Sequence, residues 1–349
     1  MKLNDLLNQT SEWLKGSGPK SDIVISSRIR FARNLVKAPF SDWATKDQKK
    51  DALSMIKKAM ESAGFLKDYT FFDMAELSEI DRQFLVERHL MSLEHARNPE
   101  YKALVVDNSE IISIMINEED HLRIQVLKSG FNLTEAWRII NKIDGEINKK
   151  LEYAYSSKWG YLTACPTNTG TAMRASVMLH LPALVLTKQV GKVLETVAKL
   201  SLAIRGLYGE GTEAAGNFFQ ISNQVTLGRA EEDIIGNIES IINQVIAREA
   251  NARHVLMTQD KDTLSDKTWR AYGTLKSAHM ITSDETMRLL SIVRLGVDLG
   301  VIKDIDIKSI NSLFILTQPA HLQKFEGKAS PSNERDVVRA RLIRERLKK

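Results

Sequence analysis

Cysteine is almost absent from this sequence of 349 residues, which contains a single one, Cys165. One cysteine excludes a disulfide within the chain, so the thiol is structural, reactive or without a role. A free cysteine most often behaves as a small buried hydrophobe. Cys165, however, stands directly before a proline and a run of small polar residues, in TACPTNTGTAMRASV, and these neighbours fit a core position poorly.

Long hydrophobic runs are absent as well. No uninterrupted apolar stretch approaches the roughly 18 residues that a membrane-spanning helix needs. The stretch MKLNDLLNQTSEWLKGSG at the amino terminus has polar residues throughout and lacks the apolar core of a signal peptide. With 43% hydrophobic and 27% charged residues, the composition is that of an ordinary soluble globular protein, and we expect it in the cytoplasm.

The formal net charge of +5 is concentrated near the end of the chain. Residues 324–349 contain nine lysines or arginines against four acidic residues, so the rest of the chain is close to neutral. Aromatic residues, which would stack on bases, are not interleaved with these charges. The basic tail therefore indicates a solvated helix, and we expect neither direct nucleic-acid binding nor membrane binding.

The hydrophobic periodicity predicts an α+β chain with an antiparallel β-sheet flanked by helices. Short strands joined by turn-like NSE and NEED favour a meander over βαβ units. After about residue 258 the strand signals stop, so we predict one domain over residues 1–257 and an all-helical domain over residues 258–349. The predicted strands are 22–31, 103–107, 111–116, 121–127, 161–165, 173–179 and 218–227, and the predicted helices are 45–63, 78–92, 134–151, 192–200 and 231–253.

Two stretches combine arginine with a strand end or a loop. In SSRIR, Arg28 and Arg30 are two residues apart and so point to one side of a strand, where two guanidinium groups can grip phosphate oxygens. An exposed strand face is the ordinary alternative. In IRGLYGEGTEAAGN, Arg205 precedes a glycine-rich loop that carries Glu210, a pattern that is weak alone and informative only beside the other stretches.

The turn NEEDHLR concentrates charge. It contains Glu118, Glu119, Asp120 and His121, followed by Arg123. Acidic residues in a turn are usually only solvated. Three adjacent carboxylates beside His and Arg also suit a general base whose pKa is set by its neighbours, or ligands to Mg²⁺.

The stretch after Cys165 offers small side chains and backbone amides at residues 167–171, and Arg174 lies on the following strand. It is not a Walker A loop, because the Gly-Lys-Ser/Thr ending is absent. The amides are suited to face a phosphate or to orient a thiol. With arginines nearby, Cys165 is expected to have a lowered pKa and substantial thiolate character.

Five arginines fall inside these four stretches, more than one small anion needs. They fit the triphosphate of a nucleotide, with Mg²⁺ neutralising the remaining charge and the cations stabilising a transferring phosphoryl group. The carboxylates and the thiolate form a negative counterpart. This counterpart predicts a cationic acceptor.

The segments SSRIRFAR, NEEDHLRI, CPTNTGTAMRASV and IRGLYGE resemble, in order and spacing, the signature segments of the phosphagen kinases, the creatine and arginine kinase family. The resemblance covers about residues 20 to 250. It implies an antiparallel sheet flanked by helices, similar to the catalytic domain of glutamine synthetase, with ATP and Mg²⁺ as cosubstrate and metal.

Two departures from that family refine the expectation. The small helical domain that precedes the catalytic domain in those kinases has no counterpart here, which favours an open site and a bulky acceptor. The helical region ending in NERDVVRARLIRERL resembles a bacterial branch of the family that phosphorylates arginine side chains of proteins. That resemblance implies a homodimer acting in the heat-shock response and in protein quality control. Its implied partners are an activator protein, an unfoldase-protease, and as substrates a heat-shock repressor, damaged proteins and the chain itself.

The resemblance also assigns residues by motif. The nucleotide would be bound by Ser27, Arg28, Arg30, His89, Arg123, Arg174 and Arg205. Met178 stands where the family has another adenine-side histidine. In the tail, Arg335, Asp336, Arg339 and Ala340 match a phosphoarginine-binding pocket, either regulatory or used for docking, while simple dimer packing is the alternative.

A mechanism follows as a hypothesis from the chemistry of the acceptor. Arginine is protonated at ordinary pH, so a base has to remove a proton from the attacking nitrogen. We predict Glu119 as that base, Glu118 and Glu210 as the groups that grip the guanidinium, and Cys165 as a thiolate that orients it without a covalent intermediate. The alternatives are a kinase of a small guanidino compound, an inactive adaptor that reads phosphoarginine, and a regulator that binds nucleic acid.

Overall fold

The computed structural model describes residues 3–62, 69–206 and 215–348. The strands are β1 (Val24–Arg33), β2 (Tyr69–Asp73), β3 (Ala103–Asp107), β4 (Ile112–Ile116), β5 (Leu122–Ser129), β6 (Tyr155–Ser156), β7 (Gly160–Tyr161), β8 (Met173–His180), β9 (Leu202–Arg205) and β10 (Phe218–Asn223). The α-helices are α1 (Lys46–Ser62), α2 (Glu79–Glu87), α3 (Leu93–Ala96), α4 (Leu133–Asn148), α5 (Pro182–Leu186), α6 (Val190–Lys199), α7 (Glu231–Gln259), α8 (Lys261–Ser277), α9 (Ser283–Asp298), α10 (Ile307–Leu316), α11 (Pro319–Glu326) and α12 (Ser332–Arg346). Short 3₁₀ helices include η2 (Glu12–Leu14), η5 (Pro166–Asn168) and η6 (Ala215–Asn217).

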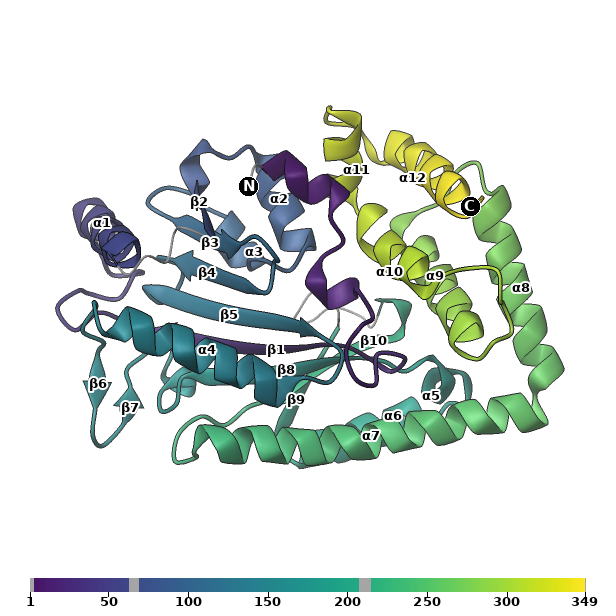
Figure 1. Ribbon diagram of the computed structural model, residues 1–349, viewed down its shortest axis with the longest axis horizontal. Coiled ribbons are helices and arrows are strands. Elements are labelled where there is room, and N and C mark those ends of the chain that lie inside the picture. The colour runs from purple at the N-terminus through teal and green to yellow at the C-terminus, as the bar shows by residue number, and fades with distance from the viewer. Residues whose placement is uncertain (1–2, 63–68, 207–214, 349) are drawn as a thin grey trace.

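An eight-stranded antiparallel sheet forms the centre of the molecule, with the strand order β2-β3-β4-β5-β1-β8-β10-β9 (Figure 1). Strands β6 and β7 form a separate hairpin at one end. No helix in the described ranges combines the length and apolar character needed to cross a membrane. The predicted class, an antiparallel sheet flanked by helices and followed by a helical region, is confirmed.

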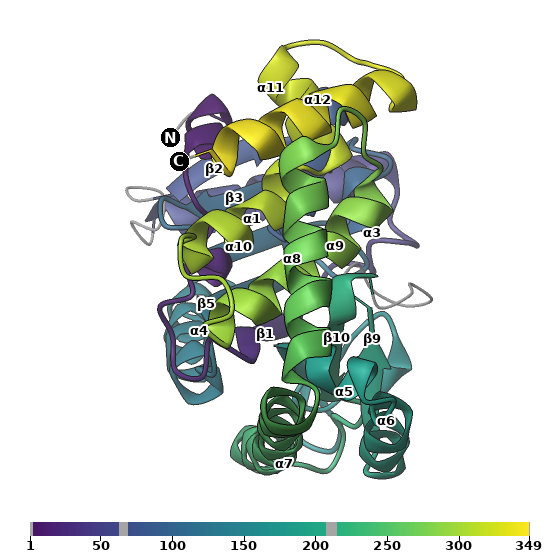
Figure 2. The same cartoon turned by 90° about the vertical axis from the view of Figure 1, so that its right-hand side faces the viewer.

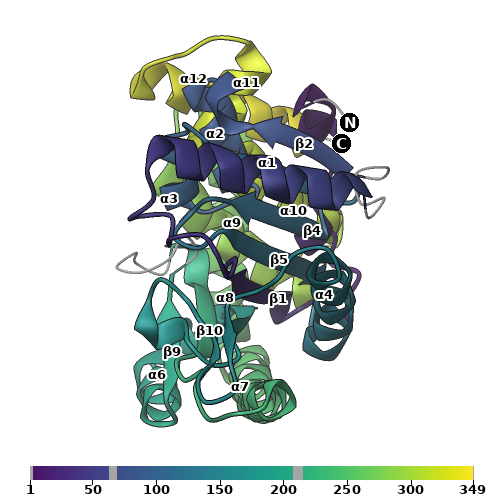
Figure 3. The same ribbon diagram turned by 90° about the vertical axis from the view of Figure 1, so that its left-hand side faces the viewer.

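The two faces of the central strands differ in chemistry because successive side chains of a strand point to opposite sides. On one face, Ile29, Ile124 and Val177 are fully buried in the largest hydrophobic core. Helices α4 and α7 cover this face, as the view from the end that carries α1 shows (Figure 3). On the other face, the register places Arg30 of β1 beside Arg174 of β8. The sheet therefore buries one face and leaves a polar face for the site.

Helices α8, α9, α10 and α12 enclose a second hydrophobic core, which they share with the sheet (Figure 2). The ring of Phe218 on β10 packs edge-on against Phe314 of α10, with 4.8 Å between ring centroids. Buried Arg294 of α9 donates to the backbone carbonyls of Ser21, at 2.7 Å, and Asp22, at 2.9 Å, directly before β1. The helical region thus contacts the chain where the central strand begins. The domain boundary predicted after residue 257 falls in the last turn of α7 and stays a prediction.

Several local predictions are confirmed. The three strands predicted between residues 103 and 127 pair as an antiparallel meander. The predicted capping box forms at the start of α1, where the backbone N of Thr45 donates to Gln48 Oε1 at 2.8 Å and the backbone N of Gln48 donates to Thr45 Oγ1 at 3.3 Å. Hydrophobic period and capping chemistry are local signals, and here the tertiary structure agrees with them.

Three predicted elements are wrong in extent. The strand predicted at 161–165 is reduced to the two residues of β7, because Pro166 begins a 3₁₀ helix directly after Cys165. The helix predicted over 78–92 ends at Glu87, since His89 adopts a left-handed backbone with φ of 59°. The strand predicted over 218–227 ends at Asn223. In each case the regular element ends earlier than the sequence pattern predicts.

The buried side chain of Arg33 links β1 to α4 and to the segment that leads into β8. Its Nη2 lies 2.8 Å from Asp144 Oδ2 of α4, and its Nη1 donates to the carbonyls of Ala32, at 2.9 Å, and Thr171, at 3.3 Å. The Tyr161 ring covers the guanidinium, 3.6 Å from its central carbon. The Arg33 side chain therefore joins β1 to α4 through an ion pair and to the segment before β8 through a hydrogen bond.

Replacing Asp144 with alanine is expected to lower the free energy of unfolding by about 3 to 5 kcal/mol, because the Arg33 guanidinium would stay buried without its partner. Chemical denaturation measures this loss. Glu135→Ala is the matched control, since the Arg138–Glu135 pair is exposed, with a separation of 3.7 Å, and its loss should cost at most about 1 kcal/mol. Equal losses for the two variants would contradict a structural role for the buried pair.

Candidate active site

Arginines from four strands converge on the polar face of the sheet. They are Arg28 and Arg30 on β1, Arg123 on β5, Arg174 on β8 and Arg205 on β9. Arg174 lies directly opposite Arg30 in the ladder, and Arg28 Nη2 donates to Gln220 Oε1 of β10 at 2.7 Å. The alternation predicted for Arg28 and Arg30 is confirmed, and the antiparallel register adds the other arginines to the same face.

A cavity of about 530 Å³ opens on this face. It brings together residues from all four stretches that the sequence singles out. Its charged and reactive lining consists of Arg30, Glu119, Arg123, Cys165, Arg174 and Arg205, and its remaining lining includes Thr167, Asn168, Ala203 and Gln224. Cationic, acidic and thiol groups therefore share one cavity.

Three of the guanidinium groups on this face, those of Arg28, Arg30 and Arg174, have no ion-pair partner among the described residues, whereas Arg123 pairs with Glu118 and Glu119. Within residues 3–62, 69–206 and 215–348, no carboxylate oxygen lies within 4.0 Å of the charged nitrogens of Arg28, Arg30 or Arg174. Burial, and then the charges of Arg174 and Arg123, lower the pKa of Arg28 to about 10. Burial and the neighbouring arginines likewise lower the pKa of Arg30. Arginine side chains stay protonated in proteins, so the face is suited to a polyanion.

Two adjacent carboxylates of the turn NEEDHLR are in opposite electrostatic states. Buried Glu118 forms an ion pair with Arg123 and accepts a bond from Ser92 Oγ. Burial raises its pKa, but Arg123 and Ser92 outweigh that effect, so the pKa of Glu118 is lowered. Glu119 lies 3.3 Å from Arg123, and burial followed by the charge of Asp120 raises its pKa. Glu118 therefore stays ionised, whereas Glu119 is suited to exchange a proton.

Asp120 joins this turn to the segment that carries Cys165. Its buried Oδ1 accepts a bond from the backbone N of Ala164 at 2.8 Å and another from Asn34 Nδ2 at 2.7 Å. Because Ala164 directly precedes the cysteine and Asp120 directly follows Glu119, this bond fixes the thiol relative to the carboxylate. Asn34 was not among the residues singled out from the sequence, since a lone asparagine after a strand carries no distinctive signal.

The loop after Cys165 packs closely on the segment that follows β10. Gly170 has a φ of 115°, and a Cβ there would lie 2.4 Å from the carbonyl oxygen of Thr226, so only glycine fits. Thr226 Oγ1 donates to the carbonyl of Thr167 at 3.1 Å. Cys165 Sγ in turn lies 3.0 Å from Thr167 Oγ1. This packing holds the thiol at the cavity, while its predicted thiolate state stays a prediction.

A small pocket adjoins the arginines at Arg28. Its lining includes Trp13, His89, Met178 and Gln220. The Trp13 ring stands edge-on to His89, with 4.7 Å between ring centroids, and burial followed by the charge of Arg28 lowers the pKa of His89 to about 3. The pocket has a volume of only about 10 Å³, so its imidazole, indole and thioether offer a surface beside a cation, against which a flat aromatic group attached to an anion can pack. The predicted nucleotide contact of His89 stays a prediction.

Ser27, which the sequence assigns to the nucleotide, lies on the other face of β1. The side chain of Ser27 is fully buried, donates to the Gly130 carbonyl at 2.9 Å and accepts from the backbone N of Asn132 at 2.9 Å. It points away from the arginines because it alternates with Arg28 along β1. Glu210 lies outside the described residues. Glu118, predicted to grip the acceptor, faces Ser92 and Arg123 instead.

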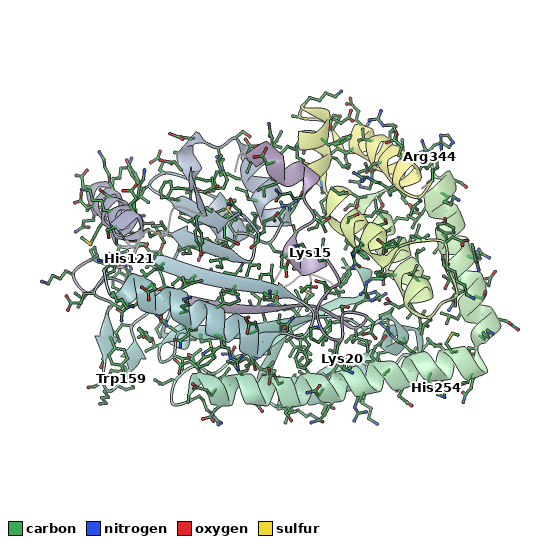
Figure 4. The ribbon with its side chains drawn as sticks, in the orientation of Figure 1. Lys15, Lys20, His121, Trp159, His254 and Arg344 are labelled. Carbon is green, nitrogen blue, oxygen red and sulfur yellow. The ribbon has the colours of Figure 1, made fainter. Side chains whose placement is uncertain are left out.

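The predicted phosphoarginine pocket lies on α12, far from the cavity. In Figure 4, Arg344 of α12 and His121 of the turn NEEDHLR mark opposite ends of the molecule. Arg335 donates to the Ser330 carbonyl at 2.6 Å, and Asp336 forms an ion pair with Arg339. Arg339 and Ala340 are buried among the C-terminal helices. Arg335 and Asp336 are the half-buried members of this group, and its ligand stays a prediction.

The sequence matches two family descriptions along most of its length. Residues 51–252 match "ATP:guanido phosphotransferase, C-terminal catalytic domain", and residues 261–349 match "Protein-arginine kinase McsB C-terminal domain". Curated relatives named protein-arginine kinase include that of Halothermothrix orenii, 47% identical over 348 residues and 99% of both chains. The one from Symbiobacterium thermophilum is 48% identical over 351 residues, again 99% of both chains.

Solved structures of similar fold are phosphagen kinases. The duplicated taurocyamine kinase from Schistosoma mansoni, with bound transition state analog components, has a TM-score of 0.61 and 29% identity, covering 67% of this chain and 34% of that chain. A lombricine kinase has a TM-score of 0.58 and 25% identity, covering 70% of this chain and 73% of that chain. Both comparisons agree with the resemblance read from the four sequence segments.

Titration of the two adjacent glutamates tests the electrostatics of this site. Glu119 is expected to titrate above the ordinary glutamate value of 4.5 and Glu118 below it, because burial and Asp120 act on the first while Arg123 acts on the second. Carboxyl ¹³C NMR, with assignments from Glu119→Gln and Glu118→Gln, measures both. The same pKa for both groups, or the reverse order, would contradict this assignment of roles.

Proposed function

The chain belongs to the ATP:guanido phosphotransferase family, and from that premise we propose that it is a protein-arginine kinase. It transfers the γ-phosphoryl group of ATP to an arginine side chain of a protein. The observation that carries this proposal is the single cavity that joins four arginines to Glu119 and Cys165. The arginines suit the triphosphate, and the carboxylate and thiol suit the guanidinium.

The donor side is an array of cations carried by strands of one sheet. Arg30, Arg123, Arg174 and Arg205 line the cavity and spread the charge of the phosphoryl group during transfer. Arg28 lines the small pocket with His89, against which we propose that the base of the nucleotide packs.

Mg²⁺ fits this site as an ion carried by the phosphates. In the described part of the chain, no group of three or more His, Cys, Asp or Glu residues is placed to hold a metal ion. Protein-bound Mg²⁺ usually keeps several waters and binds phosphate oxygens with only one or two carboxylates. When bound, it supplies charge neutralisation. We therefore propose that it enters with ATP.

The acceptor side removes a proton and positions the attacking nitrogen. The guanidinium of a free arginine has a pKa of about 12.5 to 13.8, so it is a poor nucleophile until a base acts on it. Glu119 accepts that proton as the new N–P bond forms and the P–O bond to ADP breaks. Cys165, as a thiolate, faces the guanidinium and orients it. Glu118 acts indirectly, by holding Arg123.

The cellular role is a proposal that rests on the resemblance to this branch of the family. We propose a cytoplasmic homodimer that acts in the heat-shock response and in protein quality control, marking proteins for degradation. Its proposed substrates are a heat-shock repressor, damaged proteins and the chain itself, and its proposed partners are an activator protein and an unfoldase-protease. Phosphoarginine bound at Arg335 and Asp336 would act as an allosteric signal.

Mass spectrometry of a protein substrate incubated with the chain and Mg·ATP tests the function. Conditions that preserve acid-labile phosphoramidates are needed. We expect phosphate on arginine side chains. Glu119→Ala and Cys165→Ala should each lower turnover by about 10² or more while nucleotide binding is kept, because these groups act on the acceptor.

Glu135→Ala, an exposed change on α4, is the control and should leave turnover unchanged. Phosphate on hydroxyl side chains alone would overturn the proposal. A strong preference for free arginine or creatine over protein arginine would favour the alternative of a small guanidino kinase.

Free phosphoarginine tests the role of the tail. Adding it should change the turnover of the wild-type protein but not that of Arg335→Ala, since Arg335 is a half-buried cation of the proposed pocket. Arg341→Ala, which removes another arginine of α12 that pairs with Glu326 at 2.6 Å, is the matched control and should respond like the wild type. Equal responses of all three proteins would remove the allosteric role.

A further inference from the structure

Residues 35–44, which we call the strap, lie on the turn that carries Glu119. His121 of this turn holds the strap at two points. Its Nδ1 accepts a bond from the backbone N of Leu35 at 3.2 Å, and its ring also bonds the backbone of Pro39, which offers only a carbonyl. Directly before the strap, Asn34 Oδ1 accepts from the backbone N of His121 at 3.0 Å. The start of the strap is therefore fixed beside Glu119.

The far end of the strap is held by the same turn. Asn117 Nδ2 donates to the carbonyl of Lys49, in the first turn of α1, at 2.8 Å. The capping box at Thr45 fixes the junction between the strap and α1. The strap is thus anchored on both sides of its exposed residues. Figure 4 places His121 at the same end of the molecule as α1 and the β6–β7 hairpin.

The strap presents an open aromatic ring on a defined turn. The side chain of Trp43 is 82% exposed, more than any other large hydrophobic residue described. Its backbone N donates to the Phe40 carbonyl at 2.9 Å, and its ring stands edge-on to Phe40, with 6.2 Å between centroids. The turn therefore holds an indole ring whose surface is open to a ligand.

The residue directly before Trp43 in the strap is Asp42, whose side chain is exposed. In the parts of the chain that the structure describes, no lysine or arginine nitrogen lies within 4.0 Å of it. It is nevertheless close to the catalytic turn. After burial and the charges of Asp120 and Glu118, the charge of Asp42 is a further cause of the raised pKa of Glu119. The acceptor side therefore has a second negative charge, outside the cavity.

We propose that Asp42 and Trp43 form a subsite for the residues next to the acceptor arginine in a polypeptide, and that this subsite selects a cationic neighbour. The inference rests on the proposed function and specifies its substrate class. A carboxylate beside an indole face binds lysine or arginine through ion pairing and a cation–π contact. An extended chain advances about 3.3 to 3.6 Å per residue, so residues one or two positions from the acceptor reach the rim of the cavity.

Binding of matched peptides tests this subsite. The probes are fluorescent peptides with one arginine, flanked on both sides by lysine, by glutamate or by glycine and otherwise identical. Fluorescence anisotropy measures their affinity, and phosphorylation is followed in parallel. We expect the wild-type protein to bind the lysine-flanked peptide about five- to tenfold more tightly than the glutamate-flanked one. The same preference should appear in KM rather than in kcat.

Variants of the strap should remove this preference. Asp42→Asn and Trp43→Ala are expected to reduce it to within about twofold, and Asp42→Lys to reverse it, because the charge and the ring supply it. The controls are Trp159→Ala, a half-exposed tryptophan at the same end of the molecule, and Glu61→Gln, an exposed carboxylate at the other end of α1. Both controls should keep the wild-type preference. Circular dichroism and melting temperatures verify that all variants are folded.

Full preference in Asp42→Lys and Trp43→Ala, or no preference in the wild-type protein, would overturn the subsite. The binding measurement separates this result from a failure of the proposed function. Preference in binding that depends on Asp42, without phosphate on arginine, would contradict the kinase and still support the subsite. Arginine phosphorylation at the same rate for all flanking residues would support the kinase and contradict the subsite.

Discussion

The crowding of guanidinium groups on one face of the sheet is the constraint on which the rest of the structure depends. Burial and then neighbouring arginines lower the pKa of Arg28, Arg30 and Arg174, yet no carboxylate of the described residues pairs with them. Such an arrangement is unfavourable in the unliganded protein. The largely apolar opposite face, buried against α4 and α7, offsets it. The arginines of the site and the hydrophobic core that stabilises the fold therefore lie on opposite faces of the same strands.

Four successive residues of one turn each contact a different part of the acceptor side. Glu118 holds Arg123, Glu119 faces the cavity, Asp120 bonds the segment that carries Cys165, and His121 holds the strap. Buried polar groups need partners, and each of these contacts supplies one while fixing a different part of the site. A short turn thus sets the positions of the base, the thiol and the rim of the cavity relative to one another.

The sequence predicts the parts of this site better than their connections. The spacing of Arg28 and Arg30 is a local signal, and the strand period places both on one face as observed. Ser27, by contrast, is buried on the opposite face, a fact that follows from the same period once Arg28 is taken as the reference. The roles of Asn34 and His121 depend on contacts between segments about 86 residues apart, which no local pattern contains.

The elements that the sequence misses are those whose boundaries depend on tertiary contacts. The cysteine stretch reads as a strand, but Pro166 and the close approach of Gly170 to Thr226 turn it into a loop. Strand β9 is hidden in a glycine-rich stretch and is defined only by its pairing with β10. Buried Arg339 looks like a ligand-binding arginine in the sequence, yet it bonds the carbonyl of Thr317 at 2.8 Å.

A crystal structure of the chain with Mg·ADP, nitrate and an arginine-containing peptide tests the central claim most directly, since nitrate is planar like a phosphoryl group in transfer. We predict that nitrate binds among the arginines of the cavity, that the peptide guanidinium lies against Glu119 and Cys165, and that the base of ADP lies beside His89. Phosphates bound away from Arg30 and Arg174, or a guanidinium that contacts neither Glu119 nor Cys165, would contradict it.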